Sequence, residues 1–111
     1  MRTLIALTFA ALVLAAPTAA SAATRTITVT ATDFHFKLSK ISAPAPGKVT
    51  FVLVNKGKIG HDFAIAGKKT AVIGHGKTAK LTVTLKKGRY PYKCTVPGHA
   101  ALGMKGTFTV K

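Results

Sequence analysis

The most informative stretch of this chain runs from Tyr90 to Gly106 and reads YPYKCTVPGHAALGMKG. It holds the only cysteine, Cys94, a histidine five positions later, His99, and after five more positions Met104, the only methionine besides the first residue. The Pro-Gly pair before His99 predicts a turn, with a strand on either side of the loop. One thiolate, one imidazole and one thioether can therefore converge from a single loop.

A fourth ligand must come from elsewhere, and His61 stands at the start of a predicted strand that could lie beside this loop. Taken alone, Cys94 could be an inert core cysteine or a bridge to a second chain, and Met104 a core filler. Together with His61 and His99 they form the ligand set of blue-copper electron-transfer sites, a His₂Cys plane with a weak axial methionine. Structural zinc sites prefer four His or Cys ligands instead.

The other two histidines fit a metal site less well. His35 alternates with two phenylalanines, which predicts the exposed face of a strand, and His75 lies in a glycine-flanked turn. Because a catalytic copper would need further convergent histidines, and because Asp33 and Asp62 are the only acidic side chains, we predict no enzymatic activity.

Two-residue alternation of apolar and polar residues predicts strands along the chain from residue 24 onward. It is clearest in residues 27–30, 49–54 and 81–85. Further strands are expected over Asp62–Ala66, Thr70–Ile73, Arg89–Lys93 and Lys105–Val110. Turn residues separate these segments, so we expect an all-β fold, an antiparallel Greek-key β-sandwich of about seven to eight strands.

The N-terminus predicts export. Arg2 is followed by an uncharged, mostly apolar run over Leu4–Ala16 and then by small residues at Ala20–Ala22, the pattern of a secretory signal peptide. The run is shorter than the ~20 apolar residues of a membrane-spanning helix. We therefore predict a signal peptide over residues 1–22, a single domain over residues 23–111, and a periplasmic or extracellular location.

The chain is strongly basic, with 17 lysines and arginines against two acids and a net charge of +15. Such a charge favours acidic partners and contact with anionic surfaces, while export argues against nucleic acid. A lone cysteine in an oxidising compartment forms no disulfide within its own chain. A thiolate held by a metal explains it better.

The stretch Cys94–Gly106 resembles the C-terminal copper loop of cupredoxins, close to azurin in its residues and to rusticyanin in its Cys-x4-His-x4-Met spacing. Residues 55–63 also resemble plastocyanin- and azurin-like domains, and the likeness covers nearly all of Thr26–Lys111. The resemblance implies a cupredoxin-like domain with one type 1 copper ion. Its ligands would be His61, Cys94 and His99, with Met104 bound weakly.

The chain departs from much of this family at the residue after the first histidine ligand. That residue is often Asn, but here it is Asp62, with Thr95 in the place that the family's Asn contacts. The resemblance implies that Asp62 holds the loop through Thr95 and its neighbouring amides, supporting the ligands from outside the site. A negative charge there should favour Cu(II) and lower the reduction potential.

The resemblance implies a shuttle of single electrons, which would leave through His99 and a small apolar patch around it. This patch consists of Pro97, Ala100, Ala101 and Leu102. The expected partner is an acidic redox protein, such as a cytochrome, an oxidase or a copper reductase, in transient complexes with a monomeric, soluble chain. The lysines at 56, 58, 93 and 105 could ring the metal end, either for docking or as solvated surface.

Two other functions remain open from the sequence. The first is copper storage or delivery, for which exchangeable, exposed ligand clusters are usual. The second is a basic adhesion module that binds polyanions and holds any copper only structurally.

Overall fold

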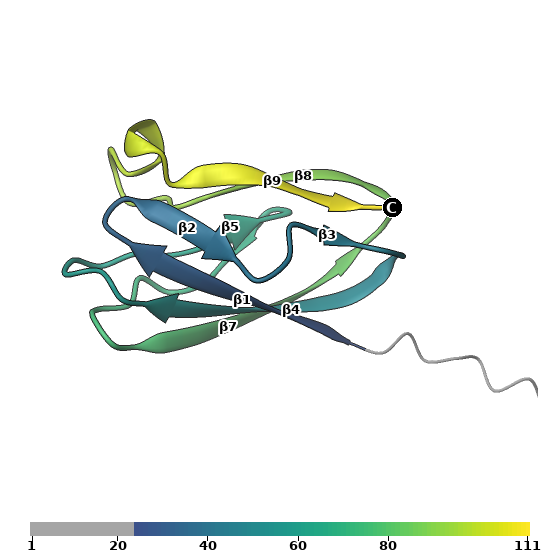
Figure 1. The fold of residues 1–111 in the computed structure, drawn as a ribbon, viewed down its shortest axis with the longest axis horizontal. Helices are drawn as coiled ribbons and strands as arrows, with labels where there is room; N and C mark the ends of the chain where they lie inside the picture. The colour runs from purple at the N-terminus through teal and green to yellow at the C-terminus, as the bar shows by residue number, and fades with distance from the viewer. Residues whose placement is uncertain (1–23) are drawn as a thin grey trace, which may run out of the picture.

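The computed structural model describes residues 24–111, and the predicted signal peptide lies outside them. Two sheets pack face to face as a sandwich (Figure 1). The strands are β1 (Arg25–Thr32), β2 (His35–Leu38), β3 (Ser42–Ala43), β4 (Gly47–Asn55), β5 (Ala64–Ile65), β6 (Lys68–Lys69), β7 (Thr78–Leu85), β8 (Gly88–Lys93) and β9 (Lys105–Val110), with one 3-10 turn, η1 (Ala100–Leu102). Within residues 24–111, no helix is long and apolar enough to cross a membrane.

The predicted all-β sandwich is confirmed, but its sheets are mixed rather than wholly antiparallel. The first sheet has the order β2-β1-β4-β7 and the second β3-β9-β8-β5-β6. β1 runs parallel to β4 and β3 runs parallel to β9, while the remaining pairs are antiparallel. The reason is that the chain crosses to the second sheet as β3 and returns beside β1, so that β4 enters in the direction of β1.

Alternation along the strands places one face of each sheet in the core. In β4, every second residue from Val49 to Asn55 is buried. Phe63 lies at the centre, with ring centroids 5.1 Å from Phe51 and 5.4 Å from both Phe36 and Tyr92. These aromatic side chains join the two sheets, and two of them lie close in sequence to a predicted ligand, Phe63 to His61 and Tyr92 to Cys94.

The strand predicted over Thr70–Ile73 is wrong. The chain turns at Ala66 and Gly67, both with positive φ, so that the short β5 and β6 pair as a hairpin before residue 70. Thr70 then turns inward, and its hydroxyl accepts the Phe63 amide proton at 3.1 Å and donates to the Ala71 carbonyl at 2.8 Å. Residues 70–73 keep one bridge, between His61 and Ile73. This segment therefore supports the His61 backbone without extending the sheet.

Because Phe63 joins both sheets, Phe63→Ala should lower the free energy of unfolding by about 3–5 kcal/mol. The exposed Ile41 offers a control, and Ile41→Ala should change the free energy of unfolding by less than about 0.5 kcal/mol. Denaturant unfolding of the metal-free protein measures both changes. Equal losses in the two variants would contradict this packing.

Candidate metal centre

The loop that contains η1 lies at one end of the sandwich (Figure 1). Three side chains meet beside this loop. One ligand atom of each of His61, Cys94 and His99 lies within 4.8 Å of the other two. The two Nδ1 atoms are 3.1 Å apart, and the Cys94 Sγ is 3.6 Å from the His99 Nδ1. The residues are 0, 1 and 7% exposed. Bonds of about 2.0 Å to nitrogen and 2.3 Å to sulfur would let one ion contact all three atoms.

Backbone hydrogen bonds close the loop that carries two of these residues. The Cys94 amide donates to the Met104 carbonyl at 3.0 Å, and the Met104 amide donates to the His99 carbonyl at 3.2 Å. Gly98 and Gly103 have φ of 84° and 120°, values that favour glycine. The loop is therefore a compact ring whose shape its own backbone maintains.

Met104 belongs to this ring and is fully buried. Its amide and carbonyl bind the backbones of His99 and Cys94, which holds the Met104 backbone beside those of two predicted ligands. Its role as a weak axial ligand stays a prediction.

His61 is held from outside the cluster by a residue that sequence reasoning missed, Asp33. The Asp33 Oδ1 lies 2.7 Å from the His61 Nε2, and its Oδ2 accepts the Lys58 amide proton at 2.8 Å. The Lys58 amide, followed by the His61 ring, holds the pKa of the Asp33 carboxyl below its ordinary value. Because an ionised carboxylate only accepts hydrogen bonds, Nε2 of His61 carries the proton. The other ring nitrogen, Nδ1, faces the cluster, 3.1 Å from the Nδ1 of His99.

Gly57 gives space to this pair. A Cβ at Gly57 would lie 2.3 Å from the Asp33 Oδ1 and 2.9 Å from the His61 Nε2, so a side chain there would displace one of them. The Asn55 side chain fixes the same loop, because it accepts the Gly57 amide proton at 2.8 Å and donates to the carbonyls of Ile59 and Ile73. The one signal for Asp33 in the sequence is the scarcity of acids, since Asp62 is the only other acidic side chain.

Asp62 connects the two ligand segments. It is buried, its Oδ1 accepts the Thr95 amide proton at 2.6 Å, and its Oδ2 accepts the Thr95 hydroxyl proton. His61 and Cys94 directly precede these two residues in the chain. The distance between the two ligands is therefore set partly by this pair of hydrogen bonds.

Burial raises the pKa of the Cys94 thiol, and backbone amide protons at Asp62 and Val96 oppose this rise in part. The raised pKa favours the neutral thiol in the absence of a metal. A metal ion binds the thiolate and must displace this proton, so metal affinity should increase with pH.

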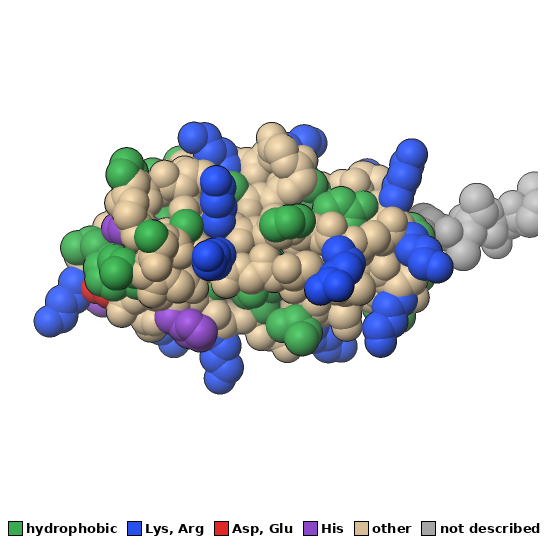
Figure 2. Space-filling model, turned by 90° about the horizontal axis from the view of Figure 1, so that it is seen from above, with side chains coloured by type: hydrophobic (Ala, Val, Ile, Leu, Met, Phe, Trp, Pro, Cys, Tyr) green, Lys and Arg blue, Asp and Glu red, His purple; other side chains and the backbone are tan. Residues whose placement is uncertain are grey.

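The surroundings of the cluster are apolar on the side of His99. The ring of Phe34, also missed by sequence reasoning, packs 5.0 Å from that of His99 and 6.3 Å from that of His61, centroid to centroid. Of the predicted exit patch, Pro97, Ala101 and Leu102 are exposed and Ala100 is half-buried. Figure 2 shows hydrophobic side chains gathered at the left-hand end of the molecule, near histidine side chains and a small acidic area.

His35 and His75 lie outside the cluster. His35 is exposed, as its alternation predicts. His75 is also exposed, although its Nδ1 lies 2.7 Å from the Gly57 carbonyl.

A buried His-Cys-His cluster at one end of a mixed β-sandwich defines a metal-binding β-sandwich protein. Residues 4–110 match the family model of the cupredoxin-like domain, so the chain belongs to the cupredoxin family. The copper-resistant cuproprotein CopI of Pseudomonas aeruginosa is 27% identical over 86% of this chain and 81% of that protein. Together these findings support a copper-binding cupredoxin.

Solved structures share the fold. An auracyanin from Roseiflexus castenholzii has a TM-score of 0.70 and 22% identity, covering 79% of this chain and 98% of that one. Auracyanin B has a TM-score of 0.67 and 24% identity, covering 78% and 88%. An azurin from Methylomonas sp. strain J has a TM-score of 0.64 and 22% identity, covering 80% and 99%.

Replacement of Asp62 by Asn tests the effect of its charge on a bound copper ion. The Asn side chain can still accept the Thr95 amide proton and donate to the Thr95 hydroxyl, so Asp62→Asn removes the charge and keeps both contacts. Voltammetry of the copper-loaded protein should show a rise of the order of 60 mV, about 1.4 kcal/mol for one electron. An unchanged or lower potential would contradict the prediction that the negative charge of Asp62 stabilises Cu(II).

Proposed function

We propose that the protein is an exported electron carrier that holds one type 1 copper ion with His61, Cys94 and His99 and, more weakly, with Met104. The observation that carries this proposal is the buried convergence of two Nδ1 atoms and one Sγ atom. Bound copper supplies one-electron chemistry by alternating between Cu(I) and Cu(II).

The surrounding contacts suit a carrier because they fix the ligand side chains. Asp33 orients His61, Asp62 binds the residue after Cys94, and the 94–104 ring sets the place of His99. Ligands that move little between oxidation states keep the reorganisation small, and electron transfer is then fast. The protein contributes a fixed set of donor atoms and excludes water from them.

The proposed route for electrons runs through His99 to the apolar patch around it. His99 is 7% exposed, with its Nδ1 3.1 Å from the Nδ1 of His61, and the proposal requires the opposite edge of its ring to face this patch. Leu102, at 63% exposure, offers an apolar contact beside it. A patch of this kind suits brief docking with an acidic redox protein such as a cytochrome, an oxidase or a copper reductase. Removal of Arg2 with the signal peptide would change the net charge from +15 to +14, and this charge would steer that protein.

Copper storage or delivery is the second candidate, and the name of the relative CopI, a copper-resistant cuproprotein, favours it. Both candidates fit a periplasmic or extracellular protein, which the predicted signal peptide also indicates. They differ in whether copper stays bound when it is reduced.

Addition of Cu(II) to the purified protein should produce an intense visible thiolate-to-copper absorption band at one copper per chain. Cys94→Ser should abolish the band, whereas His75→Gln, which changes an exposed histidine outside the cluster, should retain it. Reduction and reoxidation should bleach and restore the band with copper retained. A colourless complex would overturn the type 1 site, and release of copper on reduction would favour delivery over electron transfer.

A further inference from the structure

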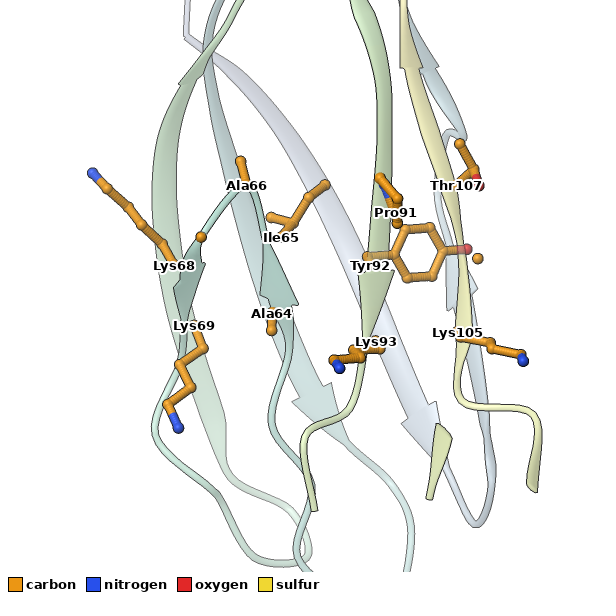
Figure 3. Close-up of a pocket in the computed structure, with 12 residues that line it drawn as sticks. Ala64, Ile65, Ala66, Lys68, Lys69, Pro91, Tyr92, Lys93, Lys105 and Thr107 are labelled. Atoms are coloured by element: carbon orange, nitrogen blue, oxygen red, sulfur yellow. The ribbon is translucent and has the colours of Figure 1, made fainter. Parts of the chain in front are cut away.

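The outer face of the second sheet carries a groove of about 900 Å³ (Figure 3). Small residues leave it hollow, including Ala64, Ala66 and Gly67. Lysines border it, namely Lys68, Lys69, Lys93 and Lys105, all of them exposed. We call this feature the lysine groove.

Three of these lysines form one row across four strands. Ala64 on β5 pairs with Lys69 on β6 and with Lys93 on β8, and Lys93 pairs in turn with Lys105 on β9. Figure 3 shows these side chains at about the same level along the strands. Like charges directly opposite each other on neighbouring strands are destabilising, so the Lys93–Lys105 pair lowers the stability of the sheet that carries it.

No acidic side chain of residues 24–111 neutralises this row. The two acidic side chains are engaged elsewhere, Asp33 by His61 and Lys58, and Asp62 by Thr95. The negative charge that would relieve the repulsion must come from another molecule. Apolar lining, with Pro91 and the lysine stems, would let that molecule bury carbon atoms as well.

The row also lies next to the metal centre in the chain. Lys93 directly precedes Cys94, and Lys105 directly follows Met104. A molecule bound in the lysine groove would therefore sit one residue away from two predicted copper ligands. A concave groove suits a protruding segment of a protein better than the flat surface of a membrane.

We propose that the lysine groove docks a carboxylate-rich segment of a protein partner. The statement that this partner is a redox protein rests on the proposed electron-transfer function. Binding at the groove itself needs only the charges and the shape of the sheet face. It can therefore be tested on the protein without copper.

The test uses the purified, metal-free protein and a hexa-aspartate peptide as the probe, with a hexa-serine peptide for comparison. Backbone ¹H–¹⁵N correlation spectra follow the titration at low salt. The aspartate peptide should shift the amide signals of residues 64–69, 92–93 and 105–107, and the serine peptide should not. Shifts that map to the first sheet, or equal shifts with both peptides, would overturn the proposal.

Two double variants with the same loss of charge separate the groove from net charge. Lys93→Gln with Lys105→Gln should weaken aspartate binding at least tenfold, because these two substitutions remove both charges of the cross-strand lysine pair. Lys48→Gln with Lys80→Gln changes exposed lysines on β4 and β7 of the other sheet and should weaken it less than twofold. If both double variants weaken binding equally, the peptide responds to the overall charge of the protein and not to the lysine groove, and the proposal is wrong. The spectra themselves report whether each variant is folded.

Vesicles of phosphatidylserine and phosphatidylcholine give the competing arm. If the groove variant loses vesicle binding while aspartate binding is unaffected, the groove serves a lipid surface and the proposal is wrong. Peptide binding in a protein that forms no coloured copper site would keep the docking surface and reject the electron carrier. Absence of peptide binding at the groove in a protein with a reversible copper site would keep the electron carrier and reject the docking surface.

Discussion

The hydrogen bond between the Asp33 carboxylate and Nε2 of His61 is the constraint on which the metal centre depends. It decides which nitrogen of a fully buried imidazole carries the proton and which one faces the sulfur of Cys94. The fold leaves room for this bond, because Gly57 lacks the side chain that would collide with it. The outer partner of a metal-binding histidine commonly sets its tautomer and its basicity, and here that partner is a full negative charge.

The distribution of charge over the molecule depends on where the two acidic side chains lie. The chain has only two acidic side chains, and each binds a segment that carries a ligand, Asp33 through His61 and Asp62 through Thr95. The lysines are left without acidic neighbours over much of the surface, and on the second sheet they face one another across strands. Because both acidic side chains are engaged beside the ligands, Asp33 at the surface and Asp62 in the interior, the side-chain charges elsewhere on the exterior are positive. The electrostatic interactions of the protein therefore point outward, to anionic molecules.

Sequence patterns predicted the sandwich and the ligand loop because both depend on residues that are close together in the chain. Alternation marks β4 and β7, and the spacing from Cys94 through His99 reflects a loop that its own backbone closes. The parallel pairing of β1 with β4 and the inward turn of Thr70 depend on contacts between distant segments, and alternation carries no information about them. Asp33 was missed for the same reason, since 28 residues separate it from His61 and no local motif joins them.

The tautomer of His61 in the metal-free protein tests this arrangement most directly. Long-range ¹H–¹⁵N correlation of the imidazole rings should show a proton on Nε2 of His61. A protonated Nδ1 with a bare Nε2 would contradict the hydrogen bond to Asp33, and with it the view that the binding face of His61 is set before the metal arrives.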